Sequence, residues 1–374
     1  MNSLRVGIVG AGNISSIYCD NLAKFPSTEL VAISDLDEAR AKTQAEKYGI
    51  RSMSVDELIA SPDIDLVLNI TIPKAHGAVA LQALESGKHV YNEKPLAVGR
   101  EDCAKMLALA SSKGLRVGCA PDTFLGAAHQ RVRKLIDDGA IGVPVAVHGW
   151  MTSRGVESWH PNPEFFYKPG AGPMLDMGPY YLTAFVNMFG PIQRLAAMTR
   201  TTFAERTISS EPLKGQVIKV ETPTTFVTAL QFQGGVVGQL TTTFDTHGFP
   251  GQPNIVVYGS EGTMVVPDPN SFNGWNEMSS KIIVRRGNGD EELFISDLPF
   301  KDNSRGLGIL DIAHAIAEGR DHRASGALAF HVLDSMLSAI ESSDESRFIT
   351  PSTQPARPDL ISESEFPAER GLMG

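Results

Sequence analysis

Residues 4–15 read Leu4-Arg5-Val6-Gly7-Ile8-Val9-Gly10-Ala11-Gly12-Asn13-Ile14-Ser15. A short run of Val and Ile ends in two glycines one residue apart, and a segment of helical composition follows. Gly10 permits a tight turn, and Gly12 lets the backbone approach a pyrophosphate, whose charge backbone amides and the helix N-terminus would meet. Ser15 replaces the third glycine of this pattern, at a packing position where a small residue can substitute. The stretch predicts a dinucleotide-binding turn with contacts at Gly10, Gly12, Asn13 and Ile14, the alternative being a glycine-rich turn that binds nothing.

The first third of the chain alternates short apolar runs with longer helical segments, which is typical of βαβ units and a parallel sheet. We expect a doubly wound Rossmann domain over residues 1–121. Its predicted strands are Leu4–Val9, Leu30–Ser34, Arg51–Met53, Leu66–Ile70, His89–Asn92 and Arg116–Ala120, and its predicted helices lie near Ile14–Lys24, Glu38–Tyr48, Val55–Ala60, Ala75–Glu85 and Glu101–Lys113. Ser54 with Glu57 forms a capping-box pattern, and Gly49, Gly87 and Gly114 stand at expected helix ends.

After about Pro121 the pattern changes to alternating apolar strands separated by turn-rich pieces. This change predicts a second, α+β domain over residues 122–349 with an open, mainly antiparallel sheet. Residues 350–374 carry several prolines among Ser and Glu and predict an extended C-terminal tail. The expected strands of the second domain are Thr224–Phe232, Val236–Phe244, Asn254–Tyr258 and Lys281–Arg285, and its expected helices are Leu175–Phe189, Gly308–Glu318 and Leu328–Ser342.

Length and composition place the chain among globular proteins. It has 374 residues, 42% of them hydrophobic and 20% charged, which excludes wholesale disorder, collagen and coiled coil. The formal charge of −10 disfavours nucleic acid and anionic membranes as partners. No signal-peptide pattern and no apolar run of the roughly 18 residues that a membrane span requires are present, so we expect a cytoplasmic protein.

The sequence predicts neither a disulfide framework nor a metal site. The three cysteines form no CxxC pair, and the spacings of His314, His322 and His331 do not place these side chains on one helix face.

Asp35 ends the second predicted strand, close to the ~20-residue offset at which a carboxylate bonds the adenosine ribose of a dinucleotide. This position favours NAD, because a 2′-phosphate would meet the negative charge at close range and Ser34 and Leu36 supply no cation. Arg40 is near enough to keep NADP as the less favoured cofactor. As an alternative, Asp35 is a helix cap or turn former.

Two further motifs lie at the ends of predicted strands: Asn92-Glu93-Lys94-Pro95, and Thr71-Ile72-Pro73-Lys74-Ala75-His76 on the neighbouring connection. Together they resemble the Gfo/Idh/MocA family of nicotinamide-dependent sugar and polyol oxidoreductases. In that family the Glu-Lys-Pro motif supplies an active-site lysine and is usually held by a cis peptide before proline. The resemblance implies that Lys94 is catalytic, and that cofactor contacts come from Thr71, Ile72, Pro73, His76, Glu93 and Lys94. Without the motif, a lysine at a strand end is usually a solvated charge.

A second signature, residues 170–181, is similar to the family's glycine-rich entry to a helix that carries an aspartate and, four residues later, a histidine. Here Asp176 keeps the aspartate and Tyr180 replaces the histidine, as in some relatives, including dimeric dihydrodiol dehydrogenases. The spacing places both on one helical face, although Pro179 interrupts the helix hydrogen bonding. The resemblance implies catalytic and substrate-binding roles for both residues. The alternatives are a helix-end role for Asp176 and core packing for Tyr180 or Tyr181.

Residues 157–167 form an aromatic, proline-stiffened loop between the two signatures, and we expect it to wall the substrate pocket. Trp159 offers a flat face for sugar C–H groups, and His160 is a candidate acid–base group if Tyr180 is not. A rigid structural loop is the alternative. Asp122, after the sixth predicted strand, is a weaker substrate-binding candidate.

These residues predict an NAD-dependent oxidoreductase that oxidises a secondary hydroxyl of a sugar, sugar derivative or cyclitol. The alternatives are a ketosugar reductase or diol dehydrogenase of the same family, and an NAD-binding redox sensor without turnover. The apolar alternating strands of the second domain also predict a homodimer or homotetramer.

Overall fold

The computed structural model describes residues 3–362, 364–366, 368 and 369. Two compact units share the chain. Unit 1 comprises Met1–Gln130, Asp297–Phe330 and Pro358–Gly374, and unit 2 comprises Arg131–Ser296 and His331–Arg357. The chain therefore enters unit 1 three times, which a linear division after residues 121 and 349 does not describe.

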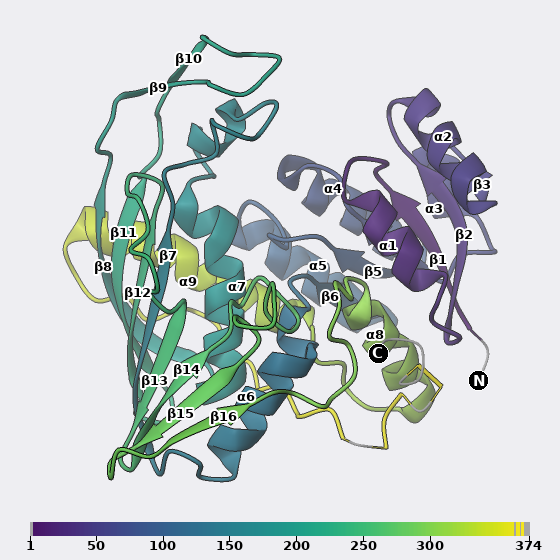
Figure 1. Ribbon diagram of the computed structural model, residues 1–374. Coiled ribbons are helices and arrows are strands. Elements are labelled where there is room, and N and C mark those ends of the chain that lie inside the picture. Colours follow the sequence, from purple (N-terminus) through teal and green to yellow (C-terminus); the bar gives the residue numbers. More distant parts are fainter. Residues whose placement is uncertain (1–2, 363, 367, 370–374) are drawn as a thin grey trace. The chain divides into compact units, whose positions relative to one another are not determined.

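Unit 1 contains a six-stranded parallel sheet in the order β3-β2-β1-β4-β5-β6 (Figure 1). This is the doubly wound Rossmann sheet that the sequence predicts. Its strands are β1 (Leu4–Val9), β2 (Thr28–Ser34), β3 (Arg51–Ser52), β4 (Leu66–Asn69), β5 (His89–Asn92) and β6 (Val117–Cys119), and its helices are α1 (Ser15–Leu22), α2 (Glu38–Tyr48), α3 (Val55–Ala60), α4 (Pro73–Glu85), α5 (Arg100–Lys113), the 3₁₀ turn η1 (Thr123–Leu125) and α8 (Leu307–Glu318).

Local signals set the limits of several of these helices. The capping box of Ser54 and Glu57 is confirmed, with both reciprocal hydrogen bonds present. Gly49 and Gly114 adopt the left-handed conformation directly after α2 and α5, as their positions predict. Strands β1, β4 and β5 are almost entirely buried, as expected for a parallel sheet covered on both faces.

A late segment of the chain covers the edge strand β6. Ser325 forms an antiparallel bridge with Gly118, and the amide of Cys119 donates to the carbonyl oxygen of Ala324 at 3.0 Å. Gly118 is needed here, because a Cβ atom would lie 2.6 Å from the Tyr91 ring. The sheet edge is thus satisfied by residues more than 200 positions later in the chain.

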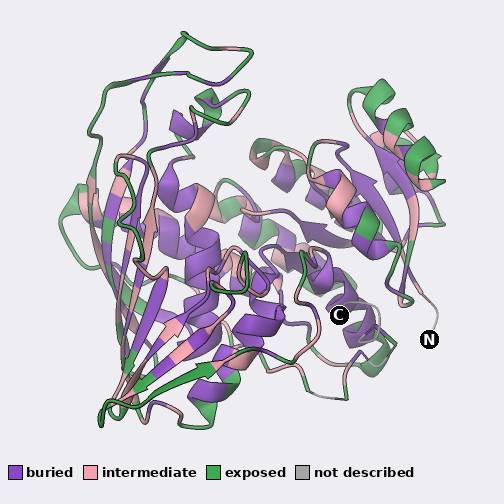
Figure 2. Cartoon of the chain, in the orientation of Figure 1, coloured by how far each residue is buried: buried purple, intermediate pink, exposed green. Residues whose placement is uncertain are grey.

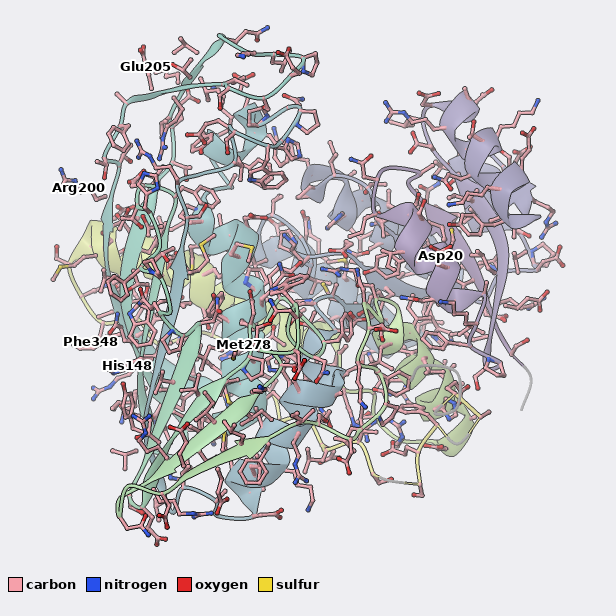
Figure 3. The ribbon with its side chains drawn as sticks, viewed as in Figure 1. Asp20, His148, Arg200, Glu205, Met278 and Phe348 are labelled. Atoms are coloured by element: carbon pink, nitrogen blue, oxygen red, sulfur yellow. The ribbon has the colours of Figure 1, made fainter. Side chains whose placement is uncertain are left out.

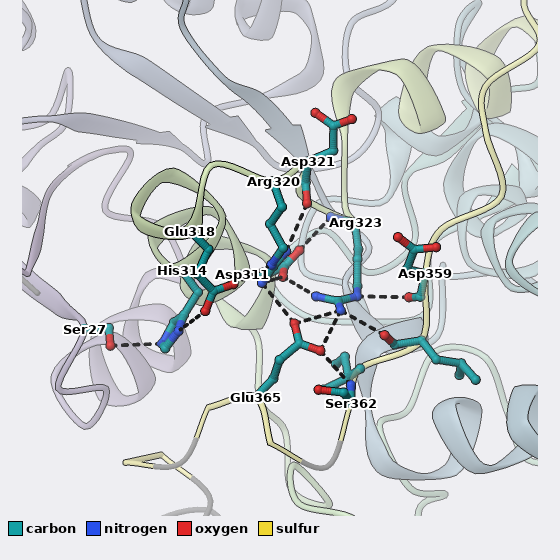
Figure 4. A network of polar contacts seen from close by, with 12 residues as sticks. Ser27, Asp311, His314, Glu318, Arg320, Asp321, Arg323, Asp359, Ser362 and Glu365 are labelled. Carbon is teal, nitrogen blue, oxygen red and sulfur yellow. Dashed lines mark hydrogen bonds and ion pairs between the residues drawn. The ribbon is translucent and has the colours of Figure 1, made fainter.

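A buried ion-pair network holds the C-terminal segment against the rest of unit 1 (Figure 4). The Arg323 guanidinium donates to Asp311 Oδ1 at 2.6 Å, to both carboxylate oxygens of Glu365 at 2.8 Å, and to the carbonyl oxygens of Asp359 and Leu360 at 2.9 Å. Residues 350–362 form no helix or strand, yet these contacts fix the segment in place. Residues 363, 367 and 370–374 of the predicted tail lie outside the described residues.

Unit 2 contains an eight-stranded mixed sheet in the order β16-β15-β14-β13-β7-β12-β11-β8, in which only the β7–β12 pair is parallel (Figure 1). Helix α7 packs against β7, β11 and β12. The strands are β7 (Pro144–Thr152), β8 (Ile192–Arg200), β11 (Thr225–Phe232), β12 (Val237–Thr243), β13 (Ile255–Gly259), β14 (Gly262–Val266), β15 (Ile282–Arg286) and β16 (Glu291–Phe294), with a separate hairpin of β9 (Glu205–Thr207) and β10 (Val217–Lys219), the 3₁₀ turn η2 (Glu164–Tyr167) and α7 (Pro173–Phe189). Helices α6 (Ala127–Asp137) and α9 (Gly326–Glu345) each span a division between the units.

The sheet face that includes His148 is less buried than the face against α7 (Figures 2 and 3). Strand register aligns one residue of each strand in a continuous row on this face. The row contains no Asp, Glu, Lys or Arg, and consists of Ala196, Ala229, Gln239, His148, Val256, Val265, Ile283 and Leu293. We call this surface the open face.

Candidate functional site

The glycine turn after β1 has the geometry that a dinucleotide requires. Gly10 has φ +113°, its amide donates to the Ser34 carbonyl oxygen at 2.8 Å, and a Cβ atom would lie 2.8 Å from the Ile70 carbonyl oxygen. Only glycine fits this position without strain. A Cβ atom on Gly12, in contrast, would meet no described heavy atom within 4 Å, so a ligand can approach the backbone there.

Asp35 joins this turn to the end of β2. Its Oδ2 atom accepts a hydrogen bond from the Ala11 amide at 2.6 Å, and its Oδ1 atom accepts one from the Asp37 amide at 2.9 Å. The side chain that caps α2 is Asp37, which also pairs with Arg40 at 3.1 Å, so the alternative of Asp35 as the helix cap is wrong. A hollow of about 260 Å³ beside the turn is lined by Ala11, Ala39, Arg40, Thr43 and Gln44. The turn, the carboxylate and the hollow together fit the adenosine half of a dinucleotide.

Lys94 lies on the turn after β5, and hydrogen bonds to the buried Glu93 carboxylate stabilise this turn. The Lys94 amide donates to Glu93 Oε2 at 2.8 Å, and the Tyr18 hydroxyl of α1 donates to Glu93 Oε1 at 2.7 Å. The Lys94–Pro95 peptide is cis. Burial, followed by the neighbouring Glu93 charge, raises the pKa of Tyr18 well above its usual value, so this phenol remains a donor. Glu93 therefore fixes the backbone from which the lysine side chain extends.

Two buried asparagines at adjacent strand ends complete this turn, and the sequence interpretation missed both. Asn69 Nδ2 donates to Asn92 Oδ1 at 3.1 Å, and Asn92 Nδ2 donates to the Leu96 carbonyl oxygen at 2.8 Å. Because the register pairs Asn69 with Asn92, the ends of β4 and β5 are joined through side chains. The sequence signal for this pair was an asparagine as the last residue of each of two consecutive buried strands, β4 and β5.

His76, a predicted cofactor contact, has both ring nitrogens next to backbone carbonyl oxygens. This side chain is fully buried, with Nδ1 at 2.7 Å from the Pro95 carbonyl oxygen and Nε2 at 3.1 Å from that of Thr71. Burial lowers the pKa of His76, against the effect of the two carbonyl groups. The residue thus links the connection after β4 to the connection after β5. Thr71 donates its hydroxyl to Asn69 Oδ1 at 2.7 Å, the Ile72 side chain is exposed, and Pro73 is the first residue of α4.

Asp122, a predicted substrate contact, is engaged by two backbone amides at the start of α8. Its Oδ2 atom accepts hydrogen bonds from the amides of Gly306 and Gly308 at 2.9 and 3.0 Å, and the residue is buried. Burial raises the pKa of this carboxyl group, while the two amides oppose the shift. Asp122 thus holds the start of α8, where a carboxylate also meets the positive end of the helix.

Helix α7 of unit 2 carries the second signature. Its N-cap Gly172 has φ +95°, and a Cβ atom there would lie 2.8 Å from the Pro223 carbonyl oxygen. Asp176 lies in the first turn, and Tyr180 follows one turn later, next to Pro179 within the helix. The Tyr181 hydroxyl is bound to the sheet: it donates to the Trp150 carbonyl oxygen at 3.0 Å and accepts from Asn254 Nδ2 at 2.9 Å.

The aromatic segment before α7 presents Trp159 with 64% of its surface exposed. His160 lies edge-on to Trp159 and Phe166, with ring centroids at 5.4 and 5.1 Å. The Asn162 amide donates to His160 Nδ1 at 3.1 Å, which assigns the proton of a neutral ring to Nε2. The segment thus holds one ring nitrogen as an acceptor and presents an aromatic surface.

Each unit therefore assembles part of the predicted site. Unit 1 contains the glycine turn, Asp35, Thr71, Ile72, Pro73, Glu93 and Lys94, and unit 2 contains Trp159, His160, Asp176 and Tyr180. Among the described residues, no cluster of three or more His, Cys, Asp or Glu side chains could hold a metal ion. Within the same part of the chain, every helix is too short or too polar to cross a bilayer.

Sequence and structure comparisons match both halves of the chain. Residues 4–120 match the family model "Oxidoreductase family, NAD-binding Rossmann fold", and residues 129–265 match "GFO/IDH/MocA C-terminal domain". Inositol 2-dehydrogenase 3 of Saccharopolyspora erythraea is 35% identical over 39% of this chain and 44% of its own length. A 1,5-anhydro-D-fructose reductase of Ensifer adhaerens is 27% identical over 77% of this chain and 82% of its own length. The alignment with the inositol dehydrogenase thus spans less than half of that protein.

Solved structures share the fold over nearly the whole chain. A levoglucosan dehydrogenase in complex with NADH and L-sorbose has a TM-score of 0.78 and 22% identity, with 94% of this chain and 99% of that chain covered. An NAD-binding oxidoreductase from Klebsiella pneumoniae has a TM-score of 0.81 and 21% identity, with 94% and 100% covered. Since the two family models together cover more than half of its residues, the chain belongs to the GFO/IDH/MocA family.

Proposed function

We propose that this protein is an NAD-dependent oxidoreductase that oxidises a secondary hydroxyl of a sugar, sugar derivative or cyclitol. The observation that carries the proposal is the arrangement at one edge of the parallel sheet. Register places Val9, Asn69 and Asn92 side by side at the ends of β1, β4 and β5. The glycine turn and the Lys94 turn therefore leave the same edge, two strand spacings or roughly 10 Å apart. Ligands of open α/β sheets bind at such edges.

In this proposal a bound NAD would supply the acceptor for a hydride from the substrate carbon. The glycine turn binds the pyrophosphate through its backbone, and Asp35 binds the adenosine ribose. The Lys94 ammonium donates a hydrogen bond to the substrate oxygen and stabilises the negative charge that develops on it. Trp159 and Asp176 bind the substrate. The names of the relatives, an inositol dehydrogenase, an anhydrofructose reductase and a levoglucosan dehydrogenase, support a carbohydrate or polyol as substrate.

Two residues are candidates for accepting the hydroxyl proton. Tyr180 stands at the family position on α7, and His160 stands on the aromatic segment with Nε2 as the nitrogen not used by Asn162. A neutral imidazole is the stronger base of the two near neutral pH, because the reference pKa of a phenol is ~10. Both remain in the proposal as alternatives.

The test is turnover in the presence of NAD and a panel of cyclitols, aldoses and anhydrosugars, followed by the absorbance of reduced cofactor. The similarity to an anhydrofructose reductase makes the reverse reaction, reduction of a ketosugar by NADH, the second candidate. Turnover in either direction excludes the redox-sensor alternative. Cofactor binding without turnover in either direction would contradict an enzymatic function.

Cofactor choice follows from Asp35. We expect NAD to bind at least ten times more tightly than NADP, because a 2′-phosphate would approach the Asp35 carboxylate and the nearby Arg40 is paired with Asp37. Asp35→Ser is expected to reduce this preference by weakening NAD and relieving the repulsion of NADP. Titration calorimetry with both cofactors measures the ratio. Equal affinities for the unaltered protein would refute the role given to Asp35.

The open face supports the proposal of a homo-oligomer. It combines the uncharged row across eight strands with exposed Met198, Val227, Val237 and Tyr258. Apolar faces of this extent usually mark interfaces, and a two-fold axis makes one patch bind its own copy. We expect light scattering at micromolar concentration to give the mass of a dimer or tetramer, and Tyr258→Asp to lower that mass. A monomer for the unaltered protein would contradict this.

A further inference from the structure

The aromatic loop, defined here as residues 153–168, has a small hydrophobic core of its own. Val156, Phe166 and Tyr167 of the loop pack with Ile208, Ile218 and Val220 of the β9–β10 region and with Phe244. The loop also exposes 64% of Trp159 and 49% of Phe165. Apart from the single 3₁₀ turn η2, the described loop has no regular structure. Its aromatic surface therefore depends on what anchors the loop.

One guanidinium group provides the main polar anchor. Arg206, on β9, donates through Nη1 to Glu157 Oε1 at 2.8 Å and to the Arg154 carbonyl oxygen at 3.2 Å. Through Nη2 it donates to the Phe244 carbonyl oxygen at 2.7 Å and to Asp245 Oδ1. Arg206 thus ties two residues of the aromatic loop to the segment that follows β12.

Glu157 and Asp245, the carboxylate partners of Arg206, also accept hydrogen bonds from neighbouring hydroxyl groups. The Tyr167 hydroxyl donates to Glu157 Oε2, and the Thr224 and Thr225 hydroxyls donate to Asp245 Oδ2 at 2.7 and 3.0 Å. Burial would raise the pKa of Asp245, but hydrogen bonds from threonine hydroxyls and the charge of Arg206 lower it overall. Side-chain exposure is 5% for Arg206, 12% for Glu157 and 4% for Asp245. A charged cluster this buried is costly to form and rigid once formed.

The same hairpin region also hydrogen-bonds the part of the loop that carries Trp159 and His160. The amides of Ser209 and Ser210 donate to the Glu157 carbonyl oxygen at 2.9 and 3.1 Å, and the Ser210 hydroxyl donates to the His160 carbonyl oxygen at 2.6 Å. The backbone on both sides of Trp159 is thereby connected to the β9–β10 hairpin that carries Arg206.

We propose that Arg206 is a positioning residue for substrate binding: through Glu157 and Asp245 it fixes the aromatic loop, so that Trp159 and His160 meet the substrate already ordered. The proposal rests on the proposed function, in which these residues bind a sugar or cyclitol. Ordering a flexible loop on binding would subtract from the affinity, whereas a loop ordered beforehand avoids that cost. The expected consequence of losing Arg206 is weaker substrate binding with little change in cofactor binding, because the glycine turn belongs to unit 1.

The experiment compares Arg206→Met with Lys219→Met, which removes a charge from the exposed side of the same hairpin. Arg206→Met is expected to raise KM for the substrate roughly tenfold, as for one or two side chains that must be ordered on binding. We expect kcat to stay within about threefold, the Kd for NAD to stay unchanged, and Arg206→Lys to recover part of the loss. Lys219→Met should behave as the unaltered protein.

Two further arms distinguish positioning from general destabilisation. The triple variant Glu157→Gln, Arg206→Met, Asp245→Asn leaves no unpaired buried charge, and should fold while showing the same rise in KM. In a Trp159→Ala background, Arg206→Met should add little, because both changes act through one surface. Amide hydrogen exchange should rise in residues 153–168 and not in the strands of the eight-stranded sheet.

An unchanged KM in a folded Arg206→Met or triple variant would overturn the proposal, as would full additivity with Trp159→Ala. The exchange measurement separates this inference from the proposed function. If the unaltered protein turns over no polyol, the proposed function fails. Faster exchange confined to residues 153–168 would then still show that Arg206 orders the loop, and unchanged exchange there would refute it.

Discussion

Replacing Lys94 by alanine is expected to lower kcat by roughly 10²–10³, the loss typical of removing one donor that stabilises a developing oxyanion. The change removes a charge-assisted hydrogen bond that strengthens as the substrate hydroxyl loses its proton. The Kd for NAD should change little, because the proposed pyrophosphate and ribose contacts lie at the glycine turn and Asp35. Steady-state kinetics with the best substrate of the panel, together with calorimetry for NAD, measure both quantities.

The matched control is Lys105→Ala, which removes an exposed lysine of the same unit that pairs with Glu101 on α5. It should retain the kcat of the unaltered protein. Tyr180→Phe and His160→Ala then distinguish the two proton acceptors: the acceptor should lose turnover and the acidic limb of the pH profile, and the other should mainly raise KM. If Lys94→Ala keeps near-native turnover and a normal pH profile, the catalytic role implied by the family resemblance does not apply to this protein.

Arg323→Met is expected to lower the free energy of unfolding by roughly 3 kcal/mol, toward the lower end of the range for breaking a buried ion pair. Asp311 is completely buried and Arg323 has 6% of its side chain exposed. The loss of unfolding free energy should stay near the lower end of that range, because Arg320 remains 2.9 Å from Asp311 Oδ1 and still pairs with it. Removal of the guanidinium also leaves the carbonyl oxygens of Asp359 and Leu360 without this donor. Urea unfolding measures the change.

A suitable comparison is Arg51→Met, since Arg51 pairs with Asp63 at 3.0 Å and both side chains are about half exposed. Exposed pairs contribute about 0–1 kcal/mol, so this variant should unfold close to the unaltered protein. If both arginine variants lose the same free energy of unfolding, the Arg323 network contributes no more to stability than an ordinary surface ion pair.

Local sequence patterns were sufficient to predict most strands and helices of the Rossmann sheet in unit 1. The predicted strands at Leu4–Val9 and His89–Asn92 match β1 and β5, because short apolar runs between turn signals specify buried parallel strands. In the second half the same reasoning located β11, β12, β13, β15 and the helices α7, α8 and α9 to within about two or three residues. Strand β7 was missed, although it pairs with both β12 and β13: His148, Gly149 and Trp150 interrupt the simple alternation of apolar residues.

The contacts of two candidate-site residues, Asp122 and His76, could not be predicted from the sequence. Asp122 was placed correctly at the carboxyl edge of the sheet, but its partners are amides 184 and 186 positions away in the chain. His76 stands in the motif that carries the family resemblance, yet its ring meets the Pro95 carbonyl oxygen on a separate connection. Position at a strand end can be predicted from local periodicity, whereas burial is decided by segments that only the tertiary structure brings together. The Arg206 anchor went unnoticed for the same reason.

The return of residues 324 and 325 to strand β6 bears on how the chain is made on the ribosome. The six strands of the parallel sheet have all been synthesised by Cys119, but the residues that cover its edge and the Arg323 network, which extends to Glu365, come more than 200 residues later. At ~5–20 residues per second, that interval lasts roughly 10–50 s. During it the nascent Rossmann unit has an unpaired edge strand, a surface prone to association with other chains. We therefore expect productive folding of this half to require protection of the edge until residues 324–325 and the Arg323 network have been synthesised.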